Sequence, residues 1–221
     1  GQLPSVFTTR RNGASLAPYE SLNLAQHVGD DAQTVARNRE LLRKITGPVQ
    51  FMNQVHGDDV VEVKTLIDDP TCDALITTVP GIALAVMVAD CIPLLLSSSG
   101  VVGAVHVGRR GLMNSVAIKA VEAMRALGAG QIHAQLGASI CGRCYEVPQE
   151  LADEVCAKHP AASSLTNNLT PALDLPRALI ADLVAIGVTY EASPICTLEN
   201  NEYFSYRRHN ITGRNAGVVW L

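Results

Sequence analysis

The pattern of apolar and polar positions predicts several helices along the chain. The clearest covers residues 31–45, because Asp30 or Asp31 can cap its first turn and Gly47-Pro48 ends it. The full set of predicted helices covers residues 31–45, 111–127, 148–158 and 175–185.

Short β-prone segments are interspersed with these helices. The segment over residues 82–88 is continuously apolar, which is typical of a strand buried on both faces. His56-Gly57-Asp58 lies at a turn between two further segments. The predicted strands cover residues 6–9, 49–55, 60–63, 82–88, 92–96, 101–107, 132–136, 188–190 and 217–220. Because strands and helices do not alternate strictly, the pattern predicts an α/β or α+β fold with mixed sheets.

The composition predicts a dense hydrophobic core and argues against one class of binding partner. Hydrophobic residues make up 48% of the 221 residues and charged residues only 17%. No linker or repeat divides the chain, so we expect one domain over residues 1–221. The net charge of −4 leaves no basic face for a phosphate backbone, which argues against a nucleic-acid partner.

No segment is suited to crossing a membrane or directing secretion. The most apolar stretch, residues 81–96, is short and contains Asp90 and Pro93. The first residues lack the charged and apolar regions of a signal peptide. We therefore expect a cytoplasmic protein without a membrane partner.

Cys91 and His106 are the first candidate pair for chemistry. A turn-like cluster, Ser97-Ser98-Ser99-Gly100, separates two β-prone segments, and a symmetric hairpin centred there places Cys91 directly opposite His106. Pro93 is the weak point, because it removes one ladder donor. A thiolate beside an imidazole can share a metal ion or form a nucleophile–base pair.

His56 is a third candidate, because it lies at the end of a predicted strand, where sites are often assembled. Each residue also has a structural interpretation. His56 could cap a turn, Cys91 could be a small buried apolar residue, and His106 could be a hydrogen-bonded core histidine.

The six cysteines are interpreted as thiols, because the chain is large enough to fold without disulfides. Cys141 and Cys144 form a CxxC motif, but a zinc ribbon needs a second cysteine pair and none follows. A thioredoxin-like motif would open a helix, which residues 145–148 do not resemble. We expect a structural role for the motif, with redox activity as the lesser alternative.

Arginines concentrate in loop-like segments, and guanidinium groups suit phosphate or carboxylate recognition. A phosphate-handling pocket and plain surface charge are both open interpretations. The arginines concerned are Arg10, Arg11, Arg109, Arg110, Arg207, Arg208 and Arg214.

Several segments together resemble the YfiH-type laccase-domain family, which is also described as multicopper-polyphenol-oxidase-like or as a peptidoglycan editing factor. They run in order along nearly the whole chain. The matching segments are Phe7-Thr8-Thr9-Arg10-Arg11-Asn12-Gly13, Tyr19-Glu20-Ser21-Leu22-Asn23-Leu24, His27-Val28-Gly29-Asp30-Asp31, Gln54-Val55-His56-Gly57, Asp73-Ala74-Leu75-Ile76-Thr77, Ala89-Asp90-Cys91-Ile92-Pro93, Val105-His106-Val107-Gly108-Arg109-Arg110-Gly111-Leu112, Tyr203-Phe204-Ser205-Tyr206-Arg207-Arg208 and Thr212-Gly213-Arg214.

The resemblance implies a layered α-β-β-α sandwich and a catalytic zinc ion held by His56, Cys91 and His106. It also implies phosphate-dependent cleavage of adenosine, inosine, guanosine and methylthioadenosine, with deamination of adenosine alongside. One departure is Arg109, which places a charge beside His106 where the family usually has tryptophan.

For the phosphate and substrate, Arg10, Arg110 and Arg214 are the candidates. The expected partners are therefore a purine nucleoside and phosphate, and the protein is expected to be a monomer or homodimer.

Three alternatives remain. Cys91 and His106 could form a metal-free cysteine hydrolase, an amidase acting on cell-wall peptide precursors. Copper could occupy the site in vitro or support polyphenol oxidation, although only six histidines are present for coupled copper centres. Zinc could instead be structural in a binding protein without enzymatic activity, with a fourth ligand supplied by Cys72, Cys141 or Cys144.

Overall fold

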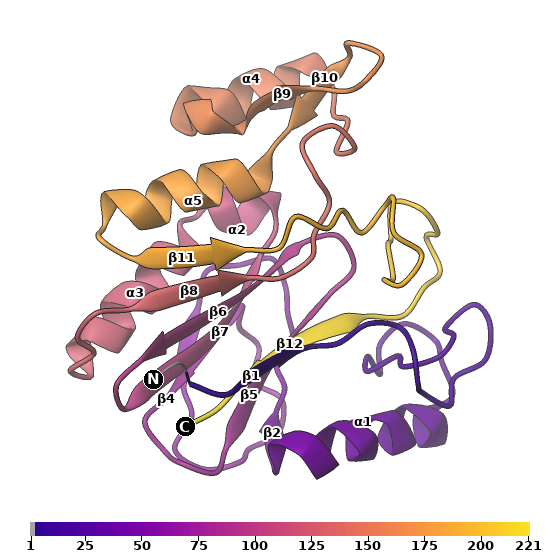
Figure 1. Ribbon diagram of the computed structural model, residues 1–221, viewed down its shortest axis with the longest axis vertical. Helices are drawn as coiled ribbons and strands as arrows, with labels where there is room; N and C mark the ends of the chain where they lie inside the picture. The colour runs from indigo at the N-terminus through magenta and orange to yellow at the C-terminus, as the bar shows by residue number, and fades with distance from the viewer. Residues whose placement is uncertain (1–2) are drawn as a thin grey trace.

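Two facing β-sheets lie at the centre of the molecule, and helices cover their outer faces (Figure 1). This computed structural model describes residues 3–221. The smaller sheet has the order β1-β12-β5-β2 and consists of β1 (Ser5–Phe7), β2 (Val49–Gln50), β5 (Ala83–Val88) and β12 (Asn215–Val219). The larger sheet has the order β11-β8-β6-β7-β4-β3 and consists of β3 (Val60–Glu62), β4 (Ala74–Thr77), β6 (Ile92–Ser98), β7 (Val101–Val107), β8 (His133–Leu136) and β11 (Thr189–Ala192).

The helices divide between the two outer faces. One helix, α1 (Ala32–Thr46), covers the smaller sheet, whereas α2 (Arg109–Met113), α3 (Val116–Ala126) and α5 (Leu175–Ala185) lie against the larger one (Figure 1). Outermost are α4 (Gln149–Lys158), a 3₁₀ turn (Pro160–Ala162) and the two-stranded sheet of β9 (Ser163–Leu165) and β10 (Pro171–Leu173).

Three apolar clusters correspond to the interfaces between the layers. One lies between α1 and the smaller sheet, one between the sheets, and one between the larger sheet and its helices. β5 shows the principle, because Leu84 and Val86 face the inter-sheet core while Ala85 and Met87 face the α1 side. The prediction of a strand buried on both faces is confirmed, as is the α+β class with mixed sheets.

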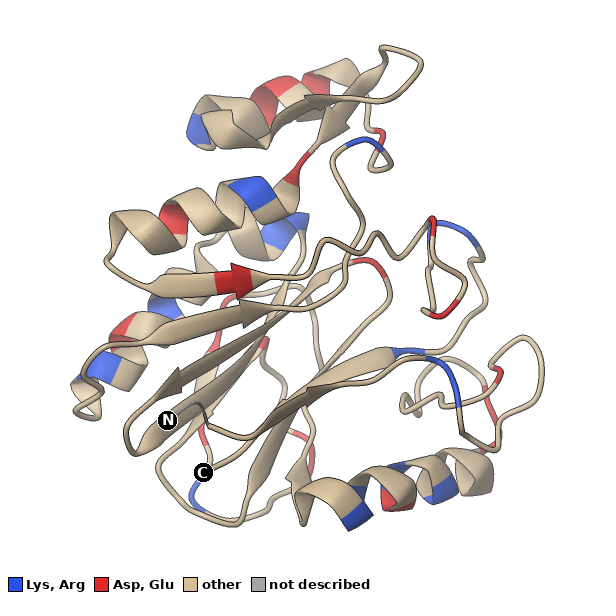
Figure 2. Ribbon diagram, viewed as in Figure 1, with Lys and Arg blue, Asp and Glu red and all other residues tan. Residues whose placement is uncertain are grey.

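Charged residues concentrate on the outer helices and the connecting loops, and the strands are almost free of them (Figure 2). Within residues 3–221 no helix combines the length and apolar character that crossing a bilayer requires.

Two predicted elements are wrong in extent. The segment 49–55 forms a strand only at Val49–Gln50, and β2 and β3 belong to different sheets, so His56 lies in a connection between sheets. The helix predicted over 111–127 is broken between α2 and α3, where Ser115 has a left-handed φ of 63°. The strand β4, with all four residues buried, was not among the predicted strands, nor were β9 and β10.

The predicted hairpin register is also wrong, but the error leaves each side chain on the same face of the sheet. A two-residue turn joins Ser98 to Val101, so His106 pairs with Pro93 and not with Cys91. The turn therefore falls at Ser99-Gly100, one residue later than predicted, and Gly100, with a φ of 76°, accommodates it. Because the shift is two residues and the side-chain period is two, Cys91 and His106 still project from the same face of the sheet.

Candidate metal centre

His56, Cys91 and His106 come together where the two sheets meet at the end of their strands. The ligand atoms of the three side chains all lie within 4.8 Å of one another. Cys91 directly precedes β6, His106 lies in β7, and the His56 ring packs edge-on against the His106 ring with centroids 4.7 Å apart. His106 is 3% exposed, Cys91 is partly buried and His56 is exposed, so the group opens to solvent on one side.

Asp73 organises two of these three residues. Its fully buried carboxylate accepts N–H groups from Val55 (3.1 Å), His56 (3.0 Å) and Gly57 (2.7 Å), and its Oδ1 lies 2.7 Å from Nδ1 of His106. Nδ1 of His106 therefore carries the proton, and Nε2 is the nitrogen left for a ligand. The carboxylate also supports the strained backbone of His56, whose φ is 59°.

Gln54 attaches the same loop to the other sheet. Its amide donates to the carbonyl of Met87 at 2.7 Å and accepts from the Met87 N–H at 2.8 Å, at the end of β5. The loop that carries His56 is thus tied to the smaller sheet through Gln54 and to the larger sheet through Asp73.

The electrostatics favour a thiolate next to a protonated imidazole when no metal is bound. Burial opposes charge on both groups, but the charge and hydrogen bonds of His106, together with those of His56, lower the pKa of Cys91 to about 6. The Cys91 thiolate and the hydrogen bond from Asp73 in turn raise the pKa of His106 to about 9. Burial alone would raise the pKa of Asp73, but its hydrogen bonds with His106, Gly57 and Val55 hold it below its ordinary value. A divalent cation bound at Nε2 could take the place of the second proton of His106 as the partner of the thiolate.

Gly108 leaves room for these side chains. A Cβ atom at this position would lie 2.9 Å from the sulfur of Cys91 and 3.3 Å from Cδ2 of His56. The backbone of Gly108 is extended, with φ −94°, so the requirement for glycine is one of space and not of conformation.

The three side chains line a cavity of about 490 Å³, a volume suited to a small-molecule ligand. Three arginines line it as well, namely Arg109, Arg207 and Arg214. Arg207 stacks 5.1 Å from the Tyr145 ring centre and Arg214 lies 6.0 Å from that of Tyr206. Burial lowers the pKa of Arg214, and Cys91 and Asp90 partly offset that effect. The cavity therefore combines a metal-type donor set with cationic side chains.

The predicted arginines are distributed differently from the expectation. Arg214 lines the cavity, and so does Arg109, which places a charge where the family usually has tryptophan. Arg110 is exposed on α2. Arg10 lies at a separate pocket with Pro18 and His209, where its guanidinium stacks 4.8 Å from the Phe204 ring centre.

Sequence reasoning assigned no role to Asp73 or to Asp90. Asp90, with a φ of 98°, accepts a hydrogen bond from Thr197 Oγ1 at 2.6 Å and one from the Arg207 N–H at 2.7 Å. The sequence feature that could have identified Asp73 is an acidic residue directly before a short apolar run. That run forms the buried strand β4.

Comparison with known proteins gives one consistent family. Residues 4–221 match the model of the family described as multi-copper polyphenol oxidoreductase laccase. A purine nucleoside phosphorylase of Streptomyces griseus is 48% identical over 234 residues, covering 100% of this chain and 95% of the relative. One of Streptomyces coelicolor is 49% identical over 227 residues, covering 97% and 94%.

Solved structures agree with the sequence comparisons. A DUF152 protein of Neisseria meningitidis superposes with a TM-score of 0.91 at 34% identity, covering 98% of this chain and 93% of that one. The YfiH protein of Bacillus licheniformis gives a TM-score of 0.90 at 28% identity, covering 98% and 92%. The resemblance found in the sequence is confirmed, and this chain belongs to the YfiH (DUF152) family of multi-copper polyphenol oxidoreductase laccase proteins.

Proposed function

We propose that this protein is a zinc-dependent purine nucleoside phosphorylase, acting on adenosine, inosine, guanosine and methylthioadenosine. The observation that carries the proposal is the donor set of His56, Cys91 and His106 in a cavity that also holds arginines. The names of the relatives, two of them nearly half identical over almost the full chain, support the same reaction.

The residues present fit a catalytic zinc ion. Two imidazoles and one thiolate are ordinary zinc ligands, and three protein ligands leave a fourth position for water or substrate. Bound there, zinc would act as a Lewis acid and lower the pKa of a coordinated water to about 7. The same donors also match the trigonal His₂Cys set of copper sites, so metal analysis of the purified protein is part of the test.

Residues of this chain would bind and orient the two substrates. Asp73 holds the proton on Nδ1 of His106 and so fixes the direction of that ring. Arg214 and Arg207 offer guanidinium groups to a phosphate dianion, and their stacking on Tyr206 and Tyr145 restricts where those groups point. In the reaction a phosphate oxygen bonds to C1′ of the ribose as the bond from C1′ to N9 breaks, and the leaving purine takes up a proton.

The test is turnover of adenosine by purified protein with and without inorganic phosphate, with adenine, inosine and hypoxanthine resolved by chromatography. We expect adenine and ribose 1-phosphate only when phosphate is present, and inosine in either case if deamination accompanies phosphorolysis. Cys91→Ala should abolish both products. Cys156→Ala, at a partly buried cysteine outside the site, is the matched control and should retain them. No turnover of any of the four nucleosides by zinc-loaded protein would refute the proposal.

A second candidate is a cysteine hydrolase, because the pKa of Cys91 is lowered to about 6 beside a protonated His106. Amide bonds of cell-wall peptide precursors would be its substrates. Metal content separates the two functions, since a stoichiometric zinc ion on Cys91 removes the free nucleophile. Amidase activity that survives complete chelation would favour this candidate.

A further inference from the structure

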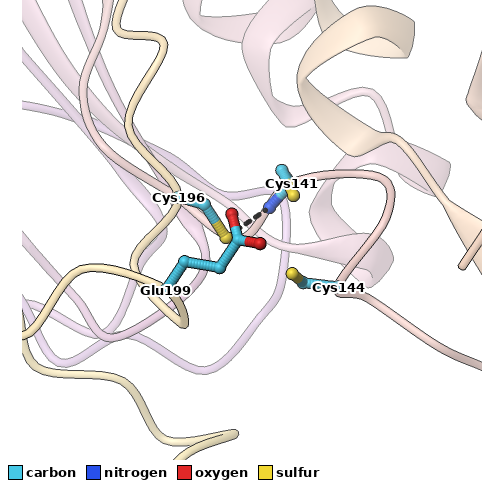
Figure 3. Close-up of side chains that lie close together, drawn as sticks. All are labelled: Cys141, Cys144, Cys196 and Glu199. Carbon is cyan, nitrogen blue, oxygen red and sulfur yellow. Dashed lines mark hydrogen bonds between the residues drawn. The ribbon is translucent and has the colours of Figure 1, made fainter. Parts of the chain in front are cut away.

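A second group of metal-type side chains lies outside the candidate centre. The sulfur atoms of Cys141, Cys144 and Cys196 and the carboxylate of Glu199 all lie within 4.8 Å of one another. Figure 3 shows them converging from two loops that are far apart in the sequence. Neither the family description nor the phosphorylase reaction assigns a role to any of them.

The two loops have the same spacing of donor residues. One is Cys-x-x-Cys and the other, Cys196-Thr197-Leu198-Glu199, is Cys-x-x-Glu. Each folds into a tight turn, with the Cys144 N–H donating to the carbonyl of Cys141 at 3.0 Å and the Asn200 N–H donating to that of Cys196 at 3.1 Å. The cysteine motif therefore has the second pair that its sequence lacked, with glutamate in the place of the last cysteine.

Backbone contacts hold the two turns together. Ser139 and Cys196 form a parallel β-bridge, and the Thr197 N–H donates to the carbonyl of Ser139 at 3.1 Å. The Cys141 N–H points at the sulfur of Cys196, 3.4 Å away (Figure 3). Such N–H donors stabilise a thiolate, so the backbone is already arranged for a charged sulfur.

Gly142 adds a steric reason for this arrangement. A Cβ atom here would lie 2.6 Å from Cβ of Asp174 and 2.9 Å from its carboxylate, at the start of α5. The cysteine turn therefore packs closely against the helix layer, and its position is fixed from that side also.

We propose that Cys141, Cys144, Cys196 and Glu199 bind a second zinc ion, which is structural and not catalytic. Tetrahedral zinc with sulfur at about 2.3 Å places neighbouring ligand atoms about 3.8 Å apart, so the four donors would close by about 1 Å or less from their present positions. Binding releases three protons from the thiols, and three thiolates with one carboxylate leave the centre with a charge of −2. Four protein ligands complete the coordination, which distinguishes this closed site from the open one at Cys91.

Without metal these thiols are protonated. Burial and the neighbouring sulfur atoms raise the pKa values of Cys144 and Cys196, which the N–H of Cys141 only partly offsets at Cys196, so zinc binding must displace their protons. A disulfide would join only two of the three cysteines and would need an external oxidant, whereas zinc uses all three together with Glu199.

The position of this site gives it a role in shaping the cavity. Ile140 and Tyr145, on either side of the cysteine turn, line the 490 Å³ cavity. Thr197, next to Cys196, donates its hydroxyl to Asp90, the residue before Cys91. The second zinc would therefore fix the cavity wall that carries Tyr145, and it would do so without contacting substrate.

The experiment counts metal ions on the full chain by native mass spectrometry, with elemental analysis as a check. Protein purified with zinc should carry two ions, and Cys91→Ala and Cys144→Ser should each carry one. Cys156→Ser, again the matched cysteine control, should keep both. Cobalt-loaded Cys91→Ala should show strong thiolate-to-cobalt charge transfer, and this band should disappear when Cys144→Ser is added.

A milder variant keeps the test valid if a cysteine variant fails to fold. Glu199 is exposed, so Glu199→Gln should fold normally and lower the affinity of one of the two zinc ions at least tenfold in a chelator titration. One zinc ion per wild-type chain, removed by Cys91→Ala, would overturn the proposal. So would a mass two hydrogens lower, showing a disulfide, in place of bound metal. Metal counting needs no turnover, so this result is independent of the phosphorylase assay.

Discussion

Replacing Asp73 by asparagine is the sharpest test of how the candidate metal centre is organised. Each carboxylate oxygen accepts two hydrogen bonds, Oδ1 from His56 and His106 and Oδ2 from Val55 and Gly57. Asparagine has the same shape, but its amide nitrogen is a donor. Whichever way the amide turns, two N–H groups will face another donor at a side chain that is fully buried.

The expected decrease in the free energy of unfolding follows from the loss of these two hydrogen bonds. A hydrogen bond to a charged group contributes about 1.5–3 kcal/mol, so the free energy of unfolding should fall by about 3–6 kcal/mol. Zinc affinity should fall about 10- to 100-fold, because Asp73 also sets the orientation of His106. The pKa of Asp73 is lower folded than unfolded, so its contribution is present above the unfolded value of about 3.8 and is lost as pH falls through the folded value.

The assay is urea unfolding with chelator present, followed by zinc affinity from competition with a chelator. Asp182→Asn is the matched control, because Asp182 is partly exposed and lies 3.3 Å from Nδ1 of His159, a pair that contains none of the candidate metal ligands. It should change the free energy of unfolding by less than about 1 kcal/mol and leave zinc affinity unchanged. A change below about 1 kcal/mol in Asp73→Asn, with unaltered zinc affinity, would refute the role assigned to Asp73.

Three further predictions follow from the cavity. Arg214→Ala should raise the KM for phosphate about tenfold or more, equivalent to about 1.4 kcal/mol, while the exposed Arg110→Ala should leave it unchanged; equal effects would remove Arg214 from phosphate binding. Gly108→Ala should weaken zinc binding by displacing the sulfur of Cys91, whereas Gly130→Ala, with no atom within 4 Å of its added Cβ, should not, as chelator competition would show. In metal-free protein, iodoacetamide should alkylate Cys91 with a midpoint near pH 6, and bound zinc should block the reaction; a midpoint above pH 8 would contradict the lowered pKa.

The sequence predicts the layers of the fold better than their connections. The continuous apolar run of β5 and the capped helix α1 were recognised because local pattern and capping determine them. β4 was not predicted, because four buried residues without alternation give too short a signal. The separation of β2 and β3 into different sheets depends on tertiary pairing, which no local pattern contains.

The sequence could place Cys91 and His106 together although the predicted register of their hairpin was wrong. Cys91 and His106 lie on one hairpin, and any even shift of its register keeps both on the same face. Asp73 and Glu199 belong to other segments, and only the folded chain brings them to His106 and to the cysteine motif. A search for a second cysteine pair could not find Cys-x-x-Glu, because it looked for one ligand type where zinc accepts several.

The hydrogen bond between Asp90 and Thr197 connects the two clusters and explains why the C-terminal loops matter to the cavity. Asp90 precedes Cys91 in the chain, and the fully buried Thr197 follows Cys196. The bond therefore joins the sequence neighbours of one candidate ligand from each cluster. Asp90 also receives the N–H of Arg207, one of the cavity cations. A displacement of the cysteine turn would therefore reach Arg207 and the backbone of Cys91 together. Arg207 lies at the candidate metal centre because its backbone is bonded to Asp90, although 117 residues separate the two in the sequence.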